Sequence, residues 1–176
     1  MKKTKKSPAN SIQDLQFFGE FGGVNPSIAD SSTFTYLAGK TMGDVFEGNR
    51  EGCYLYSRHT NPSTSYLGQA IAQMEGVKGA ILSASGMGAI TSTILQLCNT
   101  DDEIISSRTI YGGTYAFMKN YLQKFNIKTT FVNTTDLTQI EDAITDKTKV
   151  IYCETMSNPL LEVSDIQAIS KVAKKN

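Results

Sequence analysis

From residue 61 onward, stretches with helical spacing of apolar residues alternate with short apolar runs. The short runs, at residues 80–82, 104–105, 129–132 and 150–153, predict buried strands rather than helices. Strands that are apolar throughout and alternate with helices are typical of a mostly parallel sheet with helices on both faces. We therefore predict an α/β fold, in which ligands bind at the carboxyl ends of the strands.

Five helices are expected between and after these strands. The first begins at Asn61-Pro62 and ends at Gly76, both common signals for helix ends. The apolar faces of the five helices are Leu67-Ala70-Ile71-Met74, Met87-Ile90-Ile94-Leu97, Met118-Tyr121-Leu122-Phe125, Leu137-Ile140-Ala143-Ile144 and Ile166-Ile169-Val172-Ala173.

Residues 7–60 show little periodicity and are rich in Gly, Ser, Thr and Asn. We interpret them as an extended arm with a short helical turn near Ile12–Phe18, lying over the main domain or a neighbouring subunit. The expected division is an arm over residues 1–60 and an incomplete α/β domain over 61–176. The lysines at positions 2–6 indicate a solvated tail, with nucleic-acid contact as a weaker alternative.

Composition excludes several classes of function. The chain is 40% hydrophobic and 19% charged with a formal net charge of zero, so no overall field attracts nucleic acid or an anionic membrane. No apolar run reaches the roughly 18 residues needed to span a bilayer, and no signal-peptide region follows the basic start. We therefore expect a cytoplasmic protein.

Cysteine and histidine usage argues against metal and triad chemistry. Cys53, Cys98 and Cys153 are odd in number and far apart, which disfavours a disulfide framework or a zinc site. His59 is the single histidine of the sequence, which counts against a Ser-His-Asp triad and a multi-histidine metal site. We expect no bound metal.

The segment Tyr56-Ser57-Arg58 is a candidate anion clamp. In an extended segment, residues two apart point the same way, so Tyr56 and Arg58 could converge on one phosphate or carboxylate. The alternative is a surface loop with an incidental arginine.

A second candidate anion site is Ser83-Ala84-Ser85-Gly86-Met87-Gly88, which joins the expected strand 80–82 to the second helix. Small residues let an anion approach the backbone, and the helix start offers free N–H groups. Tight packing of helix on strand is the alternative. A dinucleotide fingerprint fails because Thr91 occupies its third glycine position, and no P-loop sequence is present.

Two further motifs follow strands, at the same edge of the predicted sheet. Tyr111-Gly112-Gly113-Thr114 offers an aromatic ring that could stack on a planar ligand, although a core or capping tyrosine is the alternative. Glu154-Thr155-Met156-Ser157-Asn158-Pro159 offers an asparagine held by a proline as a fixed hydrogen-bond donor. Together, a phosphate cradle, a stacking aromatic and these polar groups describe a pocket for pyridoxal 5'-phosphate (PLP).

These motifs, in their order along the chain, resemble the Cys/Met-metabolism family of PLP-dependent enzymes. That family includes cystathionine γ-synthases, cystathionine γ-lyases and methionine γ-lyases. The resemblance covers most of the chain from about residue 54 onward. The runs that carry it are Tyr56-Ser57-Arg58, Asn61-Pro62, Ser85-Gly86-Met87, Tyr111-Gly112-Gly113-Thr114, Glu154-Thr155 and Ser157-Asn158-Pro159.

The resemblance implies the large domain of a PLP-dependent transferase of the aspartate-aminotransferase-like fold, fold type I, and a set of roles. In the phosphate site, the turn Ser85-Gly86-Met87 would bind the cofactor phosphate through the N–H groups of Gly86 and Met87. Tyr56 and Arg58 would reach across a dimer interface to a neighbour's cofactor phosphate, which implies a homodimer at least and favours a homotetramer.

At the cofactor ring, the implied roles belong to three residues. Tyr111 would stack on the pyridine ring and help to activate the incoming amino acid. Asn158 would hydrogen-bond the phenolic oxygen of the cofactor, and Glu154 would support the site from behind.

The activity that the resemblance implies is γ-elimination or γ-replacement on cystathionine, methionine or an activated homoserine. The family's Schiff-base lysine and the aspartate facing the pyridine nitrogen correspond to positions beyond residue 176, so we expect the chain alone to be inactive. Gly113 stands where methionine γ-lyases often carry a cysteine, which tilts the prediction away from strict methionine specificity. The competing hypothesis is a non-catalytic fragment or assembly module with the same fold and only weak phosphate binding. A nucleotide-binding domain is disfavoured.

Overall fold

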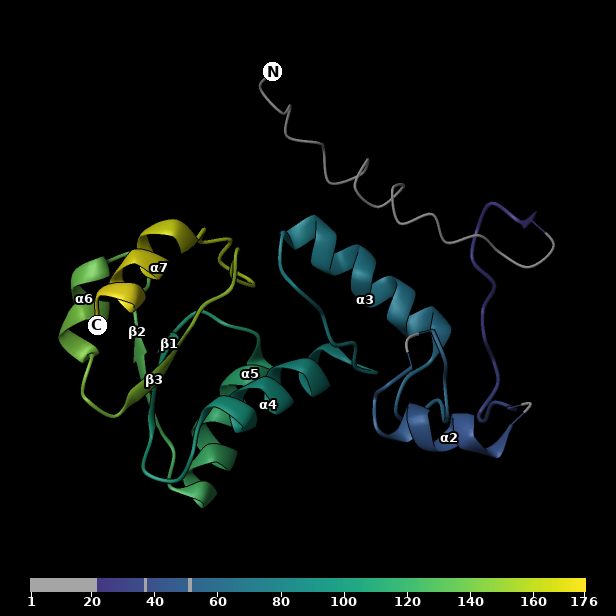
Figure 1. Ribbon diagram of the computed structural model, residues 1–176. Helices are drawn as coiled ribbons and strands as arrows, with labels where there is room; N and C mark the ends of the chain where they lie inside the picture. The colour runs from purple at the N-terminus through teal and green to yellow at the C-terminus, as the bar shows by residue number, and fades with distance from the viewer. Residues whose placement is uncertain (1–21, 37, 51) are drawn as a thin grey trace. The chain divides into compact units, whose positions relative to one another are not determined.

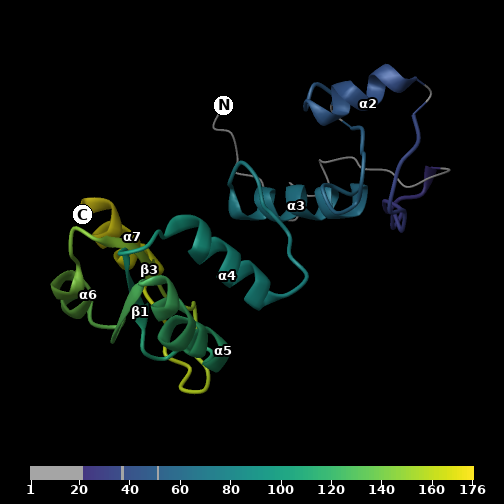
Figure 2. The ribbon, with the colours of Figure 1, turned by 90° about the horizontal axis from the view of Figure 1, so that it is seen from below.

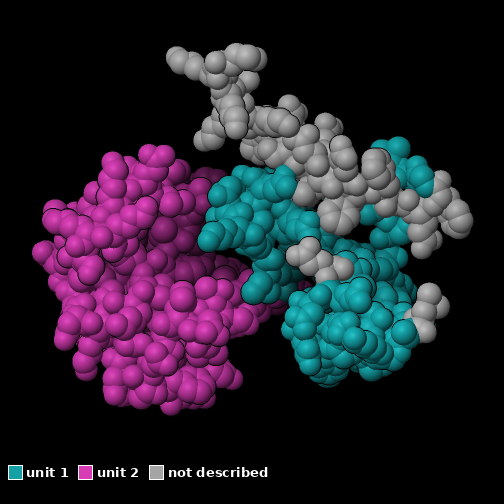
Figure 3. Space-filling view, in the orientation of Figure 1, with its two compact units in different colours: residues 1–82 teal, residues 83–176 magenta. Residues whose placement is uncertain are grey.

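The computed structural model describes residues 22–36, 38–50 and 52–176 (Figure 1). The chain divides into two compact units, residues 1–82 and residues 83–176, which are coloured separately in Figure 3. The helical turn expected near Ile12–Phe18 and the lysines at positions 2–6 lie outside the described residues. The predicted division of the chain at residue 60 stays a prediction.

The first unit contains α2 (Gly39–Phe46) and α3 (Pro62–Glu75). Helix α3 begins where the sequence predicts, because the Asn61 side chain accepts a hydrogen bond from the Ser63 N–H. It ends at Gly76, which has a φ of 68° that glycine adopts without steric cost.

The buried face of α3 differs from the predicted one. Leu67 and Met74 are about half exposed, whereas the buried residues are the small Gly68, Ala70 and Ala72. A Cβ atom at Gly68 would lie 2.8 Å from the Ala80 carbonyl oxygen, so the chain that returns after the helix passes directly over it. Close packing of the returning backbone on the helix therefore requires a glycine at position 68.

The strand expected at residues 80–82 is wrong. These residues have no regular secondary structure, and Ile81 is 98% exposed. A strand is stable only when a neighbouring strand satisfies its backbone groups, and a short apolar run carries no information about such a neighbour.

The second unit is built on a parallel sheet of β1 (Glu103–Ser107), β2 (Lys128–Val132) and β3 (Thr148–Tyr152) in the order β2-β1-β3. Three of the four predicted strands are therefore confirmed. The central strand β1 is almost entirely buried, as expected for a strand with neighbours on both sides.

Helices cover both faces of this sheet, which confirms the predicted layering. Ile104 packs in a cluster with residues of α4 (Gly86–Leu97) and of the helical stretch 112–125. The next residue of β1, Ile105, points to the other face, where it packs with α6 (Leu137–Ala143) and α7 (Ile166–Lys175). Figures 1 and 2 show these two pairs of helices on opposite sides of the strands.

The third predicted helix is a composite of three helical forms. It consists of α5 (Gly112–Ala116), a π-helical turn (Phe117–Tyr121) and a 3₁₀ turn (Leu122–Phe125). Met118 and Leu122 are fully buried, as predicted, whereas Tyr121 and Phe125 are about half exposed. The changing pitch turns these two rings away from the face that a regular helix would bury.

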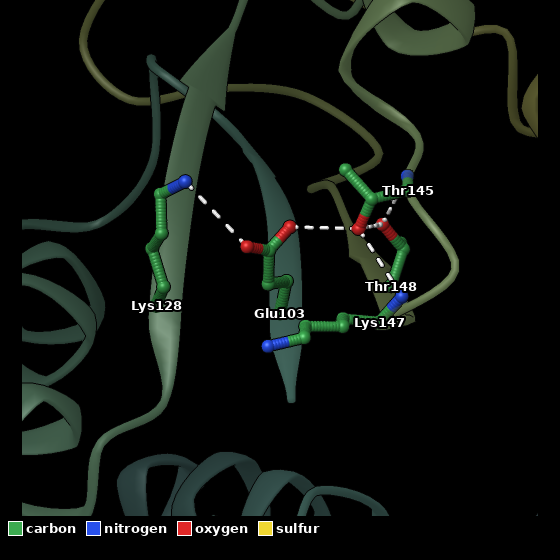
Figure 4. A network of polar contacts seen from close by, with 5 residues as sticks. All are labelled: Glu103, Lys128, Thr145, Lys147 and Thr148. Atoms are coloured by element: carbon green, nitrogen blue, oxygen red, sulfur yellow. Dashed lines mark hydrogen bonds and ion pairs between the residues drawn. The ribbon is translucent and has the colours of Figure 1, made fainter. Parts of the chain in front are cut away.

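A polar network joins the three strands at their amino-terminal edge (Figure 4). The Glu103 carboxylate accepts a hydrogen bond from Thr145 Oγ1 at 2.8 Å and lies 3.5 Å from Lys128 Nζ. The hydrogen bond from Thr145, aided by Lys128, lowers the pKa of Glu103.

Among the described helices, none is long and apolar enough to cross a membrane.

Candidate cofactor site

The carboxyl ends of β1 and β3 bring two predicted site residues into direct contact. Tyr111 follows β1 after a short loop, and Glu154 follows β3 by two residues. The Tyr111 backbone N–H donates to Glu154 Oε1 at 2.9 Å, across 43 positions of sequence. Because parallel strands end at the same edge of the sheet, the fold itself makes this contact.

The Tyr111 side chain is 55% exposed, and its ring lies against Gly113. A Cβ atom at Gly113 would be 2.5 Å from Tyr111 Cε1, closer than real Cβ atoms approach a neighbour. A glycine at position 113 is therefore required for this ring position. The exposed part of the ring is available to a planar ligand.

The amino terminus of α4 is capped by a side chain and has free backbone donors. Ser85 caps the helix, with Oγ accepting from the Gly88 N–H at 3.0 Å. Among the described residues, no acceptor faces the N–H groups of Gly86 or Met87, and a Cβ at Gly86 would meet no atom within 4 Å. Two unpaired donors at the positive end of a twelve-residue helix can bind a phosphate.

Two residues that sequence reasoning left without a role connect this helix start to the sheet. Thr114 is fully buried and donates from Oγ1 to Met87 Sδ at 3.7 Å. Tyr152, the last residue of β3, lies beside Thr114, and burial raises the pKa of its phenol. Thr114 was visible in the sequence as part of the Tyr111 motif, but its contact with Met87 depends on tertiary structure and could not be predicted.

Asn158 lies in a loop that is held by hydrogen bonds of the neighbouring Ser157 and of Glu162. Ser157 N–H donates to the Glu162 carbonyl at 2.9 Å, and Glu162 Oε2 accepts from Thr109 Oγ1 at 2.8 Å. Asn158 is exposed and its bond to Pro159 is cis. Thr109 stands two residues before Tyr111, so this loop is attached to the segment that carries the tyrosine. Nothing in the sequence pattern predicted Glu162.

Tyr56 and Arg58 belong to the first unit and form a pair there. The Arg58 guanidinium carbon lies 5.2 Å from the Tyr56 ring centroid, a cation–π distance. Within the described chain, no carboxylate pairs with Arg58. An arginine without an anionic partner, held over an aromatic ring, is suited to bind an anion.

The predicted extended conformation of this segment is wrong. The N–H groups of His59 and Thr60 both donate to the Tyr56 carbonyl, at 2.9 and 3.2 Å, so the chain turns immediately after Tyr56. The two side chains therefore meet because of the turn, and not because of strand alternation.

Comparison with known proteins gives the family. Residues 10–176 match the family model described as Cys/Met metabolism PLP-dependent enzyme. The chain belongs to this family. Its members are enzymes, their cofactor is PLP, and their large domain has the fold-type-I α/β architecture predicted from the sequence.

Individual relatives agree with this assignment. A methionine γ-lyase of Arabidopsis thaliana is 41% identical over 94% of this chain and 39% of its own length. A cystathionine β-lyase of Staphylococcus haemolyticus is 37% identical, over 89% of this chain and 38% of its own.

Solved structures give the same answer. A Campylobacter jejuni structure that contains N'-pyridoxyl-lysine-5'-monophosphate superposes with a TM-score of 0.86 at 28% identity, covering 97% of this chain and 42% of that one. The chain thus spans about two fifths of the length of the proteins that it matches.

The geometry of the second unit fits this cofactor. The free N–H groups of Gly86 and Met87 suit its phosphate, and the exposed Tyr111 ring suits its flat pyridine. Both features lie at or beside the strand ends, the edge at which α/β folds bind ligands.

Proposed function

We propose that the full-length protein carrying this chain is a PLP-dependent enzyme of sulfur amino-acid metabolism that performs γ-elimination or γ-replacement. Its substrates would be cystathionine, methionine or an activated homoserine. The observation that supports this most is the α4 amino terminus with two free N–H groups, in the same unit as the exposed Tyr111 ring. PLP, when bound, supplies the electron sink for carbanion chemistry at the substrate.

In this proposal, residues of the second unit bind the cofactor and orient it. Gly86 and Met87 bind the phosphate in the turn capped by Ser85, and Tyr111 stacks on the pyridine ring. The Tyr111 hydroxyl assists proton movement at the incoming amino group. Glu154 fixes the backbone of Tyr111, as its hydrogen bond to that N–H supports.

Two further contacts complete the proposed site. Asn158 donates to the phenolic oxygen of the cofactor from its exposed loop position. Tyr56 and Arg58 bind the cofactor phosphate of a neighbouring subunit, so the active unit is a homodimer at least. A tetrameric assembly and a cytoplasmic location stay predictions.

The direct test is turnover by the full-length protein. With PLP added, L-methionine, L-cystathionine and O-acetylhomoserine with a thiol should be compared as substrates, with release of 2-oxo acid and ammonia, or of the replacement product, as readout. We expect turnover of at least one of them, and a loss of about a hundredfold in kcat for Tyr111→Phe.

A protein that binds PLP but turns over none of these substrates would instead be the non-catalytic module. A protein that transforms only amino acids without a γ-substituent would contradict the proposed reaction class. The 176-residue chain by itself should show no turnover, because the positions of the family's Schiff-base lysine and pyridine-facing aspartate follow residue 176. Release of 2-oxo acid by this chain would overturn that part of the proposal.

A further inference from the structure

The Asn61 side chain is the centre of a hydrogen-bond network beside the Tyr56–Arg58 turn. Asn61 is 8% exposed, and both ends of its carboxamide are used. Oδ1 accepts from the Ser63 N–H at 2.8 Å, while Nδ2 donates to the Ala29 carbonyl at 2.9 Å and to Ser57 Oγ at 3.0 Å. One side chain therefore connects the start of α3, the arm and the turn.

Ser57, the residue between Tyr56 and Arg58, is the point at which this network reaches the turn. Its N–H donates to the Ser32 carbonyl at 2.9 Å, and its hydroxyl donates to the Ser31 carbonyl. Thr33 pairs with Tyr56 in an antiparallel bridge. Residues 29–33 of the arm therefore lie along the turn that follows Tyr56.

The Arg58 side chain needs this support. It is exposed and lies over the Tyr56 ring, and within the described chain its guanidinium has no ion-pair partner. A long flexible cation loses side-chain entropy when it binds an anion, so its affinity depends on how well the backbone and its aromatic support are held in place.

We propose that Asn61 is a positioning residue for phosphate binding. Its carboxamide holds the turn at Ser57 against residues 29–33, so that Tyr56 and Arg58 are presented together to the anion. This inference rests on the proposed function, in which that anion is the phosphate of PLP. An asparagine is needed because the site requires one acceptor and two donors, which no other small side chain provides.

The two tasks of Asn61 can be separated by substitution. Serine is as good a helix N-cap as asparagine, so Asn61→Ser keeps the start of α3. Its short hydroxyl cannot replace both Nδ2 contacts, with Ala29 and with Ser57. The change therefore removes the support of the turn while retaining the cap.

The experiment measures the affinities of the full-length protein for PLP and for pyridoxal, which lacks the phosphate. The proteins compared are wild type, Arg58→Ala, Asn61→Ser, the double variant, and Asp136→Ala, which removes the N-cap of α6. We expect Arg58→Ala and Asn61→Ser each to weaken PLP binding by about tenfold while leaving pyridoxal binding nearly unchanged. The double variant should resemble Arg58→Ala alone, because residues of one network are not additive.

The possible failures are distinguishable. If Arg58→Ala leaves the ratio of the two affinities unchanged, the phosphate role of the clamp is overturned, and the role of Asn61 with it. If Arg58→Ala changes the ratio but Asn61→Ser does not, or the two effects add, Asn61 is merely structural. Asp136→Ala should not alter the ratio. If Asn61→Ser does not fold, Ser57→Ala removes the Nδ2–Ser57 contact together with the bond from Ser57 to Ser31, and it should change the ratio in the same direction.

Discussion

Tyr111 shows how a single residue of the site is placed by two neighbours of different kinds. Glu154 binds its backbone N–H, and Gly113 leaves room for its ring. The motif of tyrosine and two glycines predicted an aromatic platform, and the sequence order placed Glu154 at the same edge.

The turn at Tyr56 was predicted as extended, because residue spacing alone does not reveal the hydrogen bonds that bend it.

Gly113→Ala should displace the Tyr111 ring, because the new Cβ would lie 2.5 Å from Cε1. We expect kcat/KM of the full-length enzyme to fall by about tenfold or more, since small displacements of reacting groups are costly. Gly112→Ala is the matched control, because a Cβ at Gly112 meets no atom within 4 Å. Equal losses in the two variants would show that general helix effects, and not the ring position, are responsible.

At the scale of elements, local patterns predicted what local forces decide. Helix starts at Asn61 and Ser85 follow from side chains that cap the next turn, and those helices are present. The run at residues 80–82 is as apolar as the three strands, but no strand pairs with it. The presence or absence of a pairing strand cannot be predicted from a local pattern. The composite helix from residue 112 to 125 likewise depends on how its rings pack against the sheet.

Ser85→Ala and Asp136→Ala each remove a side-chain N-cap, from α4 and α6 respectively. Both should lower the free energy of unfolding by about 1 kcal/mol in denaturant titrations. Ser85→Ala alone should also weaken PLP binding, because it loosens the turn that presents the Gly86 and Met87 N–H groups. If both variants weaken PLP binding equally, the α4 amino terminus has no special role.

The Glu103 network should make stability depend on pH. The pKa of Glu103 in the folded protein lies below its ordinary value of 4.5, chiefly through the hydrogen bond from Thr145. The carboxylate therefore contributes stability above that ordinary value, and the contribution is lost as pH falls through the lowered pKa.

Thr145→Val removes the principal donor to Glu103. Its destabilisation relative to wild type, measured by denaturant unfolding, should be larger at about pH 7 than at an acid pH below the lowered pKa of Glu103, where the carboxyl is protonated in both states. The same destabilisation at both pH values would mean that Thr145 acts through packing, and not through the charge of Glu103.

At the scale of the whole molecule, the alternation of helices and strands was enough to predict the α/β class. The order of several short motifs was enough to predict the family, which the match over residues 10–176 confirms. An assembly could not be predicted in the same way, because contacts between subunits leave no periodic pattern in one sequence. Tyr56 and Arg58 bear on this point, since they form a cationic pair that no described carboxylate neutralises.

The central claim, a PLP site completed by Tyr56 and Arg58 of a neighbouring subunit, is tested most directly by mixing subunits. Full-length Arg58→Ala and Tyr111→Phe proteins are unfolded, combined in equal amounts and refolded, and activity is measured at a PLP concentration low enough to leave Arg58→Ala largely without cofactor. If Arg58 serves the neighbour, half of the dimers are mixed and each contains one intact site, so about one quarter of wild-type activity returns. If the mixture stays as inactive as its two parents, Arg58 acts within its own subunit, and the shared site is wrong.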